Sequence, residues 1–292
     1  MVSFNYHHFS IESLQFSSMK CMLKLSLLAL TASICTDAAT LTHRYAFDDN
    51  ADDSVGSLNG TLTADNHLTL EVPLFTADIP VSAHTSFATN SIELGMSIGS
   101  MSSSVNFDGP LTDIFEDVAG SFSYWFKADQ LLGSVHLVSS IAGGSGLRTL
   151  LLNNGNIRLK GAGMTNGVDF TFDSAVTANT WHHLVVAWDD PNGTLKIALD
   201  GSIRTQAFTA EALNNPTRLM AGNYHHKGTK PNTQFDGKLF DLQIYEGMLS
   251  DTEIITLAAN AGTAIPEPGH FGLIIGFLAL GRILVCRRIP AI

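Results

Sequence analysis

The chain has 292 residues, of which 45% are hydrophobic and 15% charged, and this composition excludes a disordered chain, a collagen and a polytopic membrane protein. Acidic side chains outnumber basic ones by 27 to 16, giving a net charge of −11. The chain therefore lacks the basic footprint of a nucleic-acid-binding protein, and its charge favours divalent cations over anionic surfaces. Residues 39–265 contain no cysteine, which excludes a disulfide or a thiolate metal site there.

The N-terminal segment has the pattern of a secretory signal peptide. Lysines flank the start of a short leucine-rich run, and small residues follow it. Thr36 and Ala38 fit the small-x-small rule for cleavage after Ala38. Residues 1–38 are therefore interpreted as an upstream extension and a signal peptide, with Met19 as the expected start. A buried helix of the domain is the alternative.

The central segment, residues 40–260, has the alternation expected of a β-rich domain. Apolar and polar side chains alternate with period two over several runs, which is typical of half-buried strands. Turn signals separate these runs by about 8–12 residues, as in a β-sandwich or jelly roll. The strongest runs cover residues 121–127, 135–140, 181–188 and 195–199.

Short turn dipeptides predict hairpins between several of these runs. Asn154-Gly155 and Asn192-Gly193 each separate two predicted strands. Asn-Gly supplies the two positive-φ positions of a type I′ turn, so this turn type is expected at both places. Asp200-Gly201 indicates a further turn.

One helix is expected at the end of the domain. Ser250 and Glu253 have the spacing of a capping box, and Ile254 and Leu257 continue it with a helical apolar stripe. Residues 261–265 are interpreted as a linker.

The C-terminal residues 266–288 form a second targeting segment. A Pro-Glu-Pro tripeptide precedes an apolar stretch, residues 271–286, and two arginines follow it. As a helix this stretch would be about 24 Å long, short of the roughly 30 Å hydrocarbon core. The order of these parts resembles the PEP-CTERM sorting signal of Gram-negative bacteria, which implies processing by an exosortase at the inner membrane. An ordinary single-span anchor is the alternative. The motif residues are Pro266, Glu267, Pro268, Arg287 and Arg288.

Three segments in order resemble the laminin-G-like, concanavalin A-like lectin/glucanase superfamily. Residues 43–56 resemble its opening strand and loop, residues 181–201 its Trp-His-His hairpin, and residues 235–245 its closing strand. The resemblance implies an all-β, concanavalin A-like jelly-roll sandwich with one short C-terminal helix, in which the first and last strands meet. A signal segment and a transmembrane-type helix flank this domain.

An acidic loop suggests a metal site. Four aspartates crowd residues 48–53, and hard oxygen donors at this density suit Ca²⁺. The resemblance makes Asp53 the preferred ligand, with Asp52 beside it and Asp241 approaching from the closing strand. A solvated acidic loop without metal is the alternative.

Histidine and aromatic side chains are further candidates for ligand contacts. His182 and His183 are adjacent in a strand, so they face opposite sides of the sheet and cannot share a metal. Tyr224, His225 and His226 lie in a predicted loop, where they are candidate ligand contacts or simply solvated. Aromatic rings stack on sugars, and Trp125, Trp188 and Phe235 are further candidates, the two tryptophans being expected in the core.

The sequence gives no support for catalysis. Glucanases of this fold use a Glu-x-Asp-x-(x)-Glu run, which places two carboxylates about 5–5.5 Å apart, and residues 40–265 contain no such run. We expect an exported, non-catalytic surface or matrix protein of a Gram-negative bacterium that binds carbohydrate or another extracellular polymer. A structural envelope protein without a ligand and a divergent glycan hydrolase are the alternatives.

Overall fold

The computed structural model describes residues 39–65, 74–83, 86–97, 101–107, 119–141, 146–161, 164–207, 218–223 and 233–265. The predicted signal peptide and sorting tail lie outside these residues.

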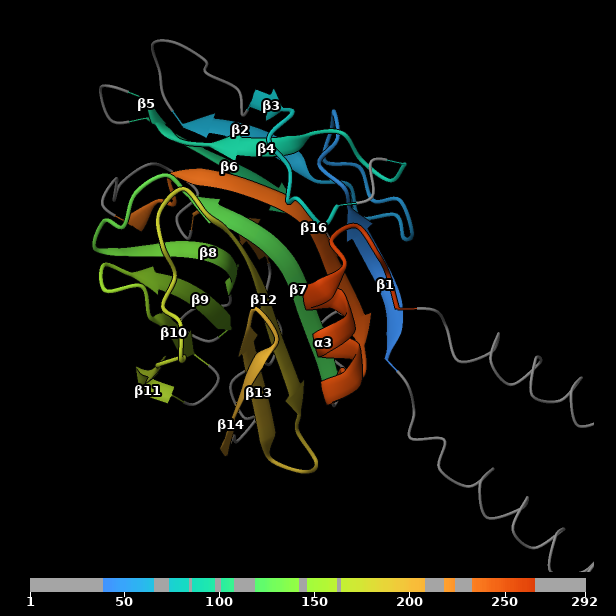
Figure 1. Ribbon diagram of the computed structural model, residues 1–292, viewed down its shortest axis with the longest axis vertical. Coiled ribbons are helices and arrows are strands. Elements are labelled where there is room, and N and C mark those ends of the chain that lie inside the picture. The colour runs from blue at the N-terminus through green and yellow to red at the C-terminus, as the bar shows by residue number, and fades with distance from the viewer. Residues whose placement is uncertain are drawn as a thin grey trace, which may run out of the picture. The chain divides into compact units, whose positions relative to one another are not determined.

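Two antiparallel sheets of eight strands each form a sandwich (Figure 1). Sheet A has the order β14-β13-β12-β7-β16-β4-β3, with β1 also paired to β16. Its strands are β1 (Thr40–Tyr45), β3 (Leu74–Thr76), β4 (Ser91–Leu94), β7 (Ala119–Ala128), β12 (Trp181–Asp189), β13 (Thr194–Leu199), β14 (Ser202–Ala207) and β16 (Gly237–Glu246).

Sheet B has the order β11-β10-β9-β8-β15-β6-β2, with β5 also paired to β6. Its strands are β2 (Thr61–Asp65), β5 (Met96–Ser97), β6 (Met101–Phe107), β8 (Ser134–Ile141), β9 (Leu147–Leu152), β10 (Ile157–Gly161), β11 (Met164–Phe170) and β15 (Arg218–Ala221). The predicted all-β sandwich is confirmed, and the arrangement is consistent with a jelly roll.

The first and last strands meet, as the resemblance implied. β1 pairs with β16, so Leu41 lies opposite Tyr245 and Tyr45 lies opposite Leu242. β16 also pairs with β7, and β7 pairs with β12. The two ends of the domain are therefore joined through the middle of sheet A.

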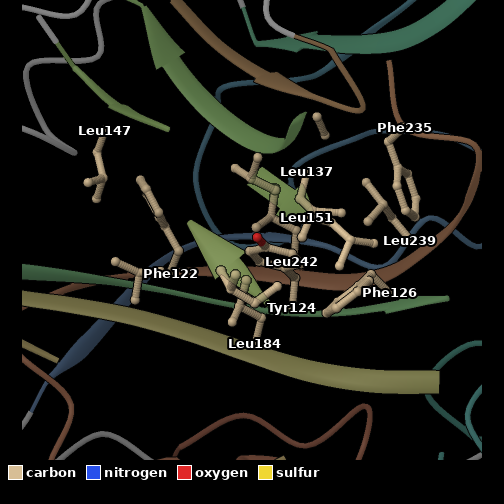
Figure 2. Close-up of a cluster of buried hydrophobic side chains, with 14 of the residues drawn as sticks. Phe122, Tyr124, Phe126, Leu137, Leu147, Leu151, Leu184, Phe235, Leu239 and Leu242 are labelled. Carbon is tan, nitrogen blue, oxygen red and sulfur yellow. The ribbon is translucent and has the colours of Figure 1, made fainter. Parts of the chain in front are cut away.

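The core fills the space between the sheets (Figure 2). The alternation in β7 sends Phe122, Tyr124 and Phe126 inward, where they meet leucines of β8 and β9, including Leu137 and Leu151. Complete burial of one such side chain contributes roughly 1.5–3 kcal/mol. The only polar atom of this group, the Tyr124 hydroxyl, is hydrogen-bonded to Thr149 Oγ1 at 2.8 Å. Burial raises the pKa of Tyr124 above its ordinary value.

The hairpins lie where the dipeptides predicted them, but their turn types differ from the prediction. Gly155 and Gly193 have positive φ, at 77° and 57°, whereas Asn154 and Asn192 do not. These loops are four residues long and use only one left-handed position, so the type I′ prediction is wrong for both. The type I′ turn is the two-residue connection from β13 to β14, where φ is 49° at Asp200 and 80° at Gly201.

The predicted helix is α3 (Asp251–Ala259), which lies on the outer face of sheet A (Figure 1). Its capping box is complete: Ser250 Oγ accepts the N–H of Glu253, and the Glu253 carboxylate accepts the N–H of Ser250. Its buried residues, Ile254 and Leu257, face the sheet. No helix within the described residues has the length and apolar character needed to cross a bilayer.

Candidate functional site

Asp53 follows β1, and hydrogen-bond donors surround its carboxylate. The side chain is 0% exposed, and its Oδ2 lies 2.6 Å from His43 Nδ1. Burial raises the pKa of Asp53, but the hydrogen bonds from His43 and the backbone outweigh this effect and lower it below its ordinary value. Asp53 therefore acts as an ionised anchor for the loop. The backbone N–H donors are those of Arg44, Val55, Gly56 and Leu58.

Asp241 lies at a bulge of β16, where the pairing with β7 changes register. Its φ of 51° is in the left-handed region, which is unfavourable for a residue with a side chain. The carboxylate accepts hydrogen bonds from Arg44 Nε at 2.8 Å, from Arg44 Nη2 at 3.0 Å and from Gln243 Nε2 at 2.6 Å. Burial raises the pKa of Asp241, and the Arg44 guanidinium opposes that rise. The result is a buried, bidentate ion pair.

Arg44 connects the two acids that were predicted to bind metal. Its backbone N–H donates to Asp53, and its guanidinium pairs with Asp241. Ca²⁺ takes six to eight oxygen ligands, so a shared ion would lie beside a guanidinium and displace N–H donors from both carboxylates. This donor set does not fit a shared Ca²⁺ site at Asp53 and Asp241.

Asp52 is exposed in the same loop, and Ca²⁺ binding there stays a prediction. Within the described ranges, no group of three or more His, Cys, Asp or Glu side chains is arranged to hold a metal ion.

The histidine pair of β12 has structural contacts on both faces, as expected. His182 Nε2 accepts the backbone N–H of Thr177 at 3.1 Å, so its Nδ1 carries the proton that is donated to Asp200 at 2.7 Å. His183 faces the other way, with Nε2 2.8 Å from Ser123 Oγ. Burial lowers the pKa of His183 to about 3, against a smaller opposing effect of Asp200. Ser123 and His183 are buried together, so no substrate reaches this pair.

The aromatic candidates have different outcomes. Trp125 and Trp188 are buried, as predicted, and Phe235 is also buried in the core. Phe235 is therefore wrong as an exposed sugar-stacking candidate. Tyr224, His225 and His226 lie outside the described residues, so their role stays a prediction. The same holds for the sorting motif.

The outer face of sheet A is covered by the protein itself. Val185, Ala187 and Tyr245 of this face pack with Ile254 and Leu257 of α3. Beside them, Trp125 and Phe240 pack with residues before β4 and after α3, including Ala88 and Ala261. Apolar packing therefore occupies this face.

On the outer face of sheet B, the middle of the sheet is also buried, because Ser139 and Met220 are 0% exposed and Asn106 is 1% exposed. Strand register places five side chains in one continuous row across the sheet, each directly opposite the next. We call this set the cross-strand row: Lys160, Arg148, Ser139, Met220 and Asn106. Its neighbours along the strands, such as Leu147, Leu151 and Leu159, point into the core. With adjacent strands 4.7–4.9 Å apart, the row is about 19 Å long.

A second row lies beside the first. Asp169, Arg158, Leu150 and His136 are opposite one another in turn. The Arg158 guanidinium binds the Asp169 carboxylate through Nε and through Nη2, the latter at 2.8 Å. The hydrogen bond to Asp169 raises the pKa of Arg158. Leu150 and His136 of this row are buried, so the exposed charged side chains of the two rows lie toward the β10–β11 edge of sheet B.

Sequence reasoning missed this face. Arg148, Arg158 and Lys160 alternate with core leucines in β9 and β10, so their outward direction was available from the period-two pattern. The pairing of Arg148 with Ser139 follows a shift of register between His136 and Ser139. That shift has no sequence signal known to us, so the row became visible only in the structure.

Comparisons with known proteins agree with this architecture. A family model described as the concanavalin A-like lectin/glucanases superfamily matches residues 99–255, more than half of the chain. Among curated proteins, no significant match was found.

Solved structures share the fold at low sequence identity. Domain 4 of AbnA, a GH43 extracellular arabinanase from Geobacillus stearothermophilus solved with arabinotriose, is 19% identical with a TM-score of 0.57, over 76% of this chain and 100% of that domain. A structure of botulinum neurotoxin type C, described as depending on two ganglioside molecules for cell entry, is 15% identical with a TM-score of 0.56. That alignment covers 76% of this chain and 51% of the toxin chain, so this chain spans about half of that relative.

The family match, the paired sheets and the contact between β1 and β16 lead to one conclusion. This chain belongs to the concanavalin A-like lectin/glucanases superfamily.

Proposed function

We propose that this protein is an exported, non-catalytic carbohydrate-binding protein, and that the outer face of sheet B is its binding face. The observation that carries the proposal is the difference between the two outer faces: α3 and its flanking segments cover sheet A, whereas Arg158, Lys160 and Asp169 are partly or fully exposed on β10 and β11 of sheet B. The fold neighbours support a carbohydrate ligand, because one was solved with arabinotriose and another is described with gangliosides.

The absence of catalysis is part of the same proposal. Glycoside hydrolysis by the usual route needs two carboxylates on one face. In sheet B, the strand side chains that the structure describes include one carboxylate, Asp169, and Arg158 binds it. This arrangement supports binding without turnover.

Export and sorting extend the proposal to the chain ends. Cleavage after Ala38 would make Ala39 the first residue, and Ala39 is already packed beside Tyr245 and Ile265. The tail from Pro266 would then direct exosortase processing at the inner membrane and release to the cell surface or matrix. N-terminal sequencing and intact mass of the exported protein test this part. A mature N-terminus other than Ala39, or a retained tail, would contradict it.

A glycan microarray with the purified chain, read with and without a chelator, tests the main proposal. We expect binding to at least one polysaccharide class, and no release of reducing sugar from the bound polymer. An absence of binding to every glycan would favour a structural envelope protein instead. Hydrolysis of a bound glucan would overturn the non-catalytic assignment. Loss of binding with chelator would restore Asp52 as a Ca²⁺ ligand.

A further inference from the structure

The cover over sheet A is incomplete at the end of the sheet where β12 begins and β7 ends. Strand register places four outward-facing side chains there, each directly opposite the next. We call them the Trp181 row: Trp181 of β12, Lys127 of β7, Lys238 of β16 and Glu93 of β4. Their neighbours along the strands, such as Phe126 and Leu239, point into the core. Trp181, Lys127 and Glu93 are partly exposed, so the row reaches solvent, unlike the middle of sheet B.

The row contains a fixed aromatic ring. Trp181 is partly exposed, whereas Trp125 and Trp188, the other two tryptophans of the chain, are buried. The Trp181 ring packs edge-on against Phe240, with the centroids 6.4 Å apart and the planes at 70°. Its Nε1 donates a hydrogen bond to Asp78 Oδ1 at 3.1 Å. A partly exposed aromatic ring that is already held in one orientation is a platform on which the C–H face of a sugar can stack at little entropic cost.

Charged groups are fixed beside this ring. Lys127 Nζ donates to Asp78 Oδ2 at 2.8 Å, and Lys238 Nζ donates to Asp129 Oδ1 at 3.3 Å. Lys238 Nζ also lies 3.6 Å from Glu93 Oε1. Burial raises the pKa of Asp78, but the hydrogen bonds that it accepts outweigh this effect and lower it below its ordinary value. Carboxylates and ammonium groups can each form several hydrogen bonds, so this cluster retains acceptors and donors for sugar hydroxyls.

The charge at this end of sheet A indicates which sugars it accepts. The ammonium groups of the row lie among the carboxylates of Asp78, Glu93 and Asp129. Asp236, partly exposed just before β16, adds a further carboxylate. The region therefore has no excess of positive charge, which would be needed to attract a polymer of acidic sugars. Neutral sugars fit it, because a hydroxyl group both donates to carboxylates and accepts from ammonium groups.

The Trp181 row also lies far from the chain ends. Lys238 precedes Glu246 by eight residues of β16, which corresponds to about 27 Å along an extended strand. Glu246 is paired with Thr40, the first residue of β1. A chain tethered through either end would leave the row open to a polymer.

From these observations we infer that the Trp181 row is a second carbohydrate-binding site, and that it binds neutral polysaccharides. Trp181 stacks on one sugar ring, while Lys127 and Glu93 form hydrogen bonds with hydroxyl groups of the same chain of sugars. The row crosses four adjacent strands and is therefore about 14 Å long. This site goes beyond the proposed function, because it lies on the other sheet and does not depend on the β10–β11 edge.

Acrylamide quenching of tryptophan fluorescence tests the inference, because Trp181 is the tryptophan most open to solvent. We expect at least one of arabinan, dextran and a β-1,3-glucan to reduce the quenching of the purified chain, and polygalacturonate to have no such effect. W181F retains only the buried tryptophans and should show no protection. W181A should weaken binding of the same polymer in affinity electrophoresis about tenfold or more, as expected for an aromatic residue at the centre of a site.

K127Q and K196Q provide a matched pair of variants on sheet A. The two lysine side chains are 18% and 17% exposed, and each binds one aspartate, at 2.8 Å and 2.7 Å. K127Q should weaken binding of the neutral polymer about two- to fivefold, as expected for one exposed charge contact. K196Q should bind it like the unaltered chain, and thermal melting checks that each variant is folded.

The outcomes separate this inference from the proposed function. Equal weakening in K127Q and K196Q would overturn the inference, and so would a failure of all three neutral polymers to protect Trp181. Glycan binding that is lost in K160Q but kept in W181A would also overturn it, while leaving the proposed face on sheet B intact. Binding of none of the polymers, together with a negative glycan array, would contradict both.

Discussion

The two sheets differ in how far the Arg–Asp ion pairs on their outer faces are exposed. On sheet A, α3 and the segments that flank it bury Val185, Tyr245 and Trp125, and the ion pair of Arg44 with Asp241 lies in the same layer. On sheet B, a bidentate pair of the same chemistry, Arg158 with Asp169, stays partly exposed. A β-sandwich needs only its inner faces for the core. The outer face of sheet A thus stabilises the fold and joins its ends, while exposed charges remain at the β10–β11 edge of sheet B, where we propose that a ligand binds.

The two Arg–Asp pairs give the strongest test of this contrast. Asp241→Ala leaves the Arg44 guanidinium buried without its carboxylate, so we expect a loss of about 3–5 kcal/mol in the free energy of unfolding. Asp169→Ala removes an exposed pair and should cost less than about 1 kcal/mol. Urea unfolding followed by tryptophan fluorescence measures both. Similar losses in the two variants would mean that the faces do not differ in this way.

The packing of α3 gives the next largest effect. Leu257 is 1% exposed against sheet A, whereas Ile255 on the opposite side of the helix is 54% exposed. Leu257→Ala should lower the free energy of unfolding by about 2–4 kcal/mol, and Ile255→Ala by less than about 0.5 kcal/mol. Glycan binding by folded Leu257→Ala protein should be unchanged, because the binding face lies on the other sheet. A loss of binding at intact fold would contradict this assignment of faces.

Acid tests the buried layer of sheet A through His183. Its pKa is about 3 in the folded protein, and an ordinary unfolded histidine has a value near 6.5. Between these values the unfolded chain binds a proton that the folded protein does not, so this contribution to stability is complete above pH 6.5 and is lost as the pH falls. The expected slope is about 1.4 kcal/mol per pH unit between pH 6 and 4.

The control for the acid experiment is His183→Gln, which cannot titrate in this range. Comparing the pH dependence of urea unfolding in the two proteins isolates His183 from the aspartates. Identical slopes for the two proteins would show that His183 is protonated in the folded state, and hence that the cover over sheet A is open to water.

The capping box of α3 has the smallest effect. Ser250→Ala removes the acceptor for the Glu253 N–H and should cost about 1 kcal/mol. Thr252→Ala, at an exposed position of the first turn, should change stability by less than about 0.5 kcal/mol. Thermal melting of both variants provides the measurement. Equal midpoints would indicate that α3 is held by packing alone.

Local patterns predicted much of the fold. Period-two alternation located β7, β12 and β13, and the spacing of Ser250 and Glu253 located α3, because both signals depend only on neighbouring residues. The turn types could not be predicted in the same way. Asn154 and Asn192 lie in four-residue loops with a single left-handed glycine, and the length of each loop is set by where strand pairing ends.

The candidate site was much less predictable. The aspartates of residues 48–53 suggested oxygen ligands for a metal. In the structure, Arg44 lies between Asp53 and Asp241, and both carboxylates accept hydrogen bonds from N–H groups. The cross-strand row depends on pairing among five strands, and its residues are separated in sequence by up to 114 positions from Asn106 to Met220. Neither feature follows from composition or spacing.

Hydrogen–deuterium exchange, measured with and without a saturating concentration of the polysaccharide that the glycan array identifies, tests the central claim most directly. We predict slower exchange in β9 and β10, at Leu147–Leu152 and Ile157–Gly161, and no change in β13 or α3. Slower exchange confined to α3 or to residues 48–59, with β9 and β10 unaffected, would show that the ligand binds elsewhere and would contradict the assignment of the outer face of sheet B.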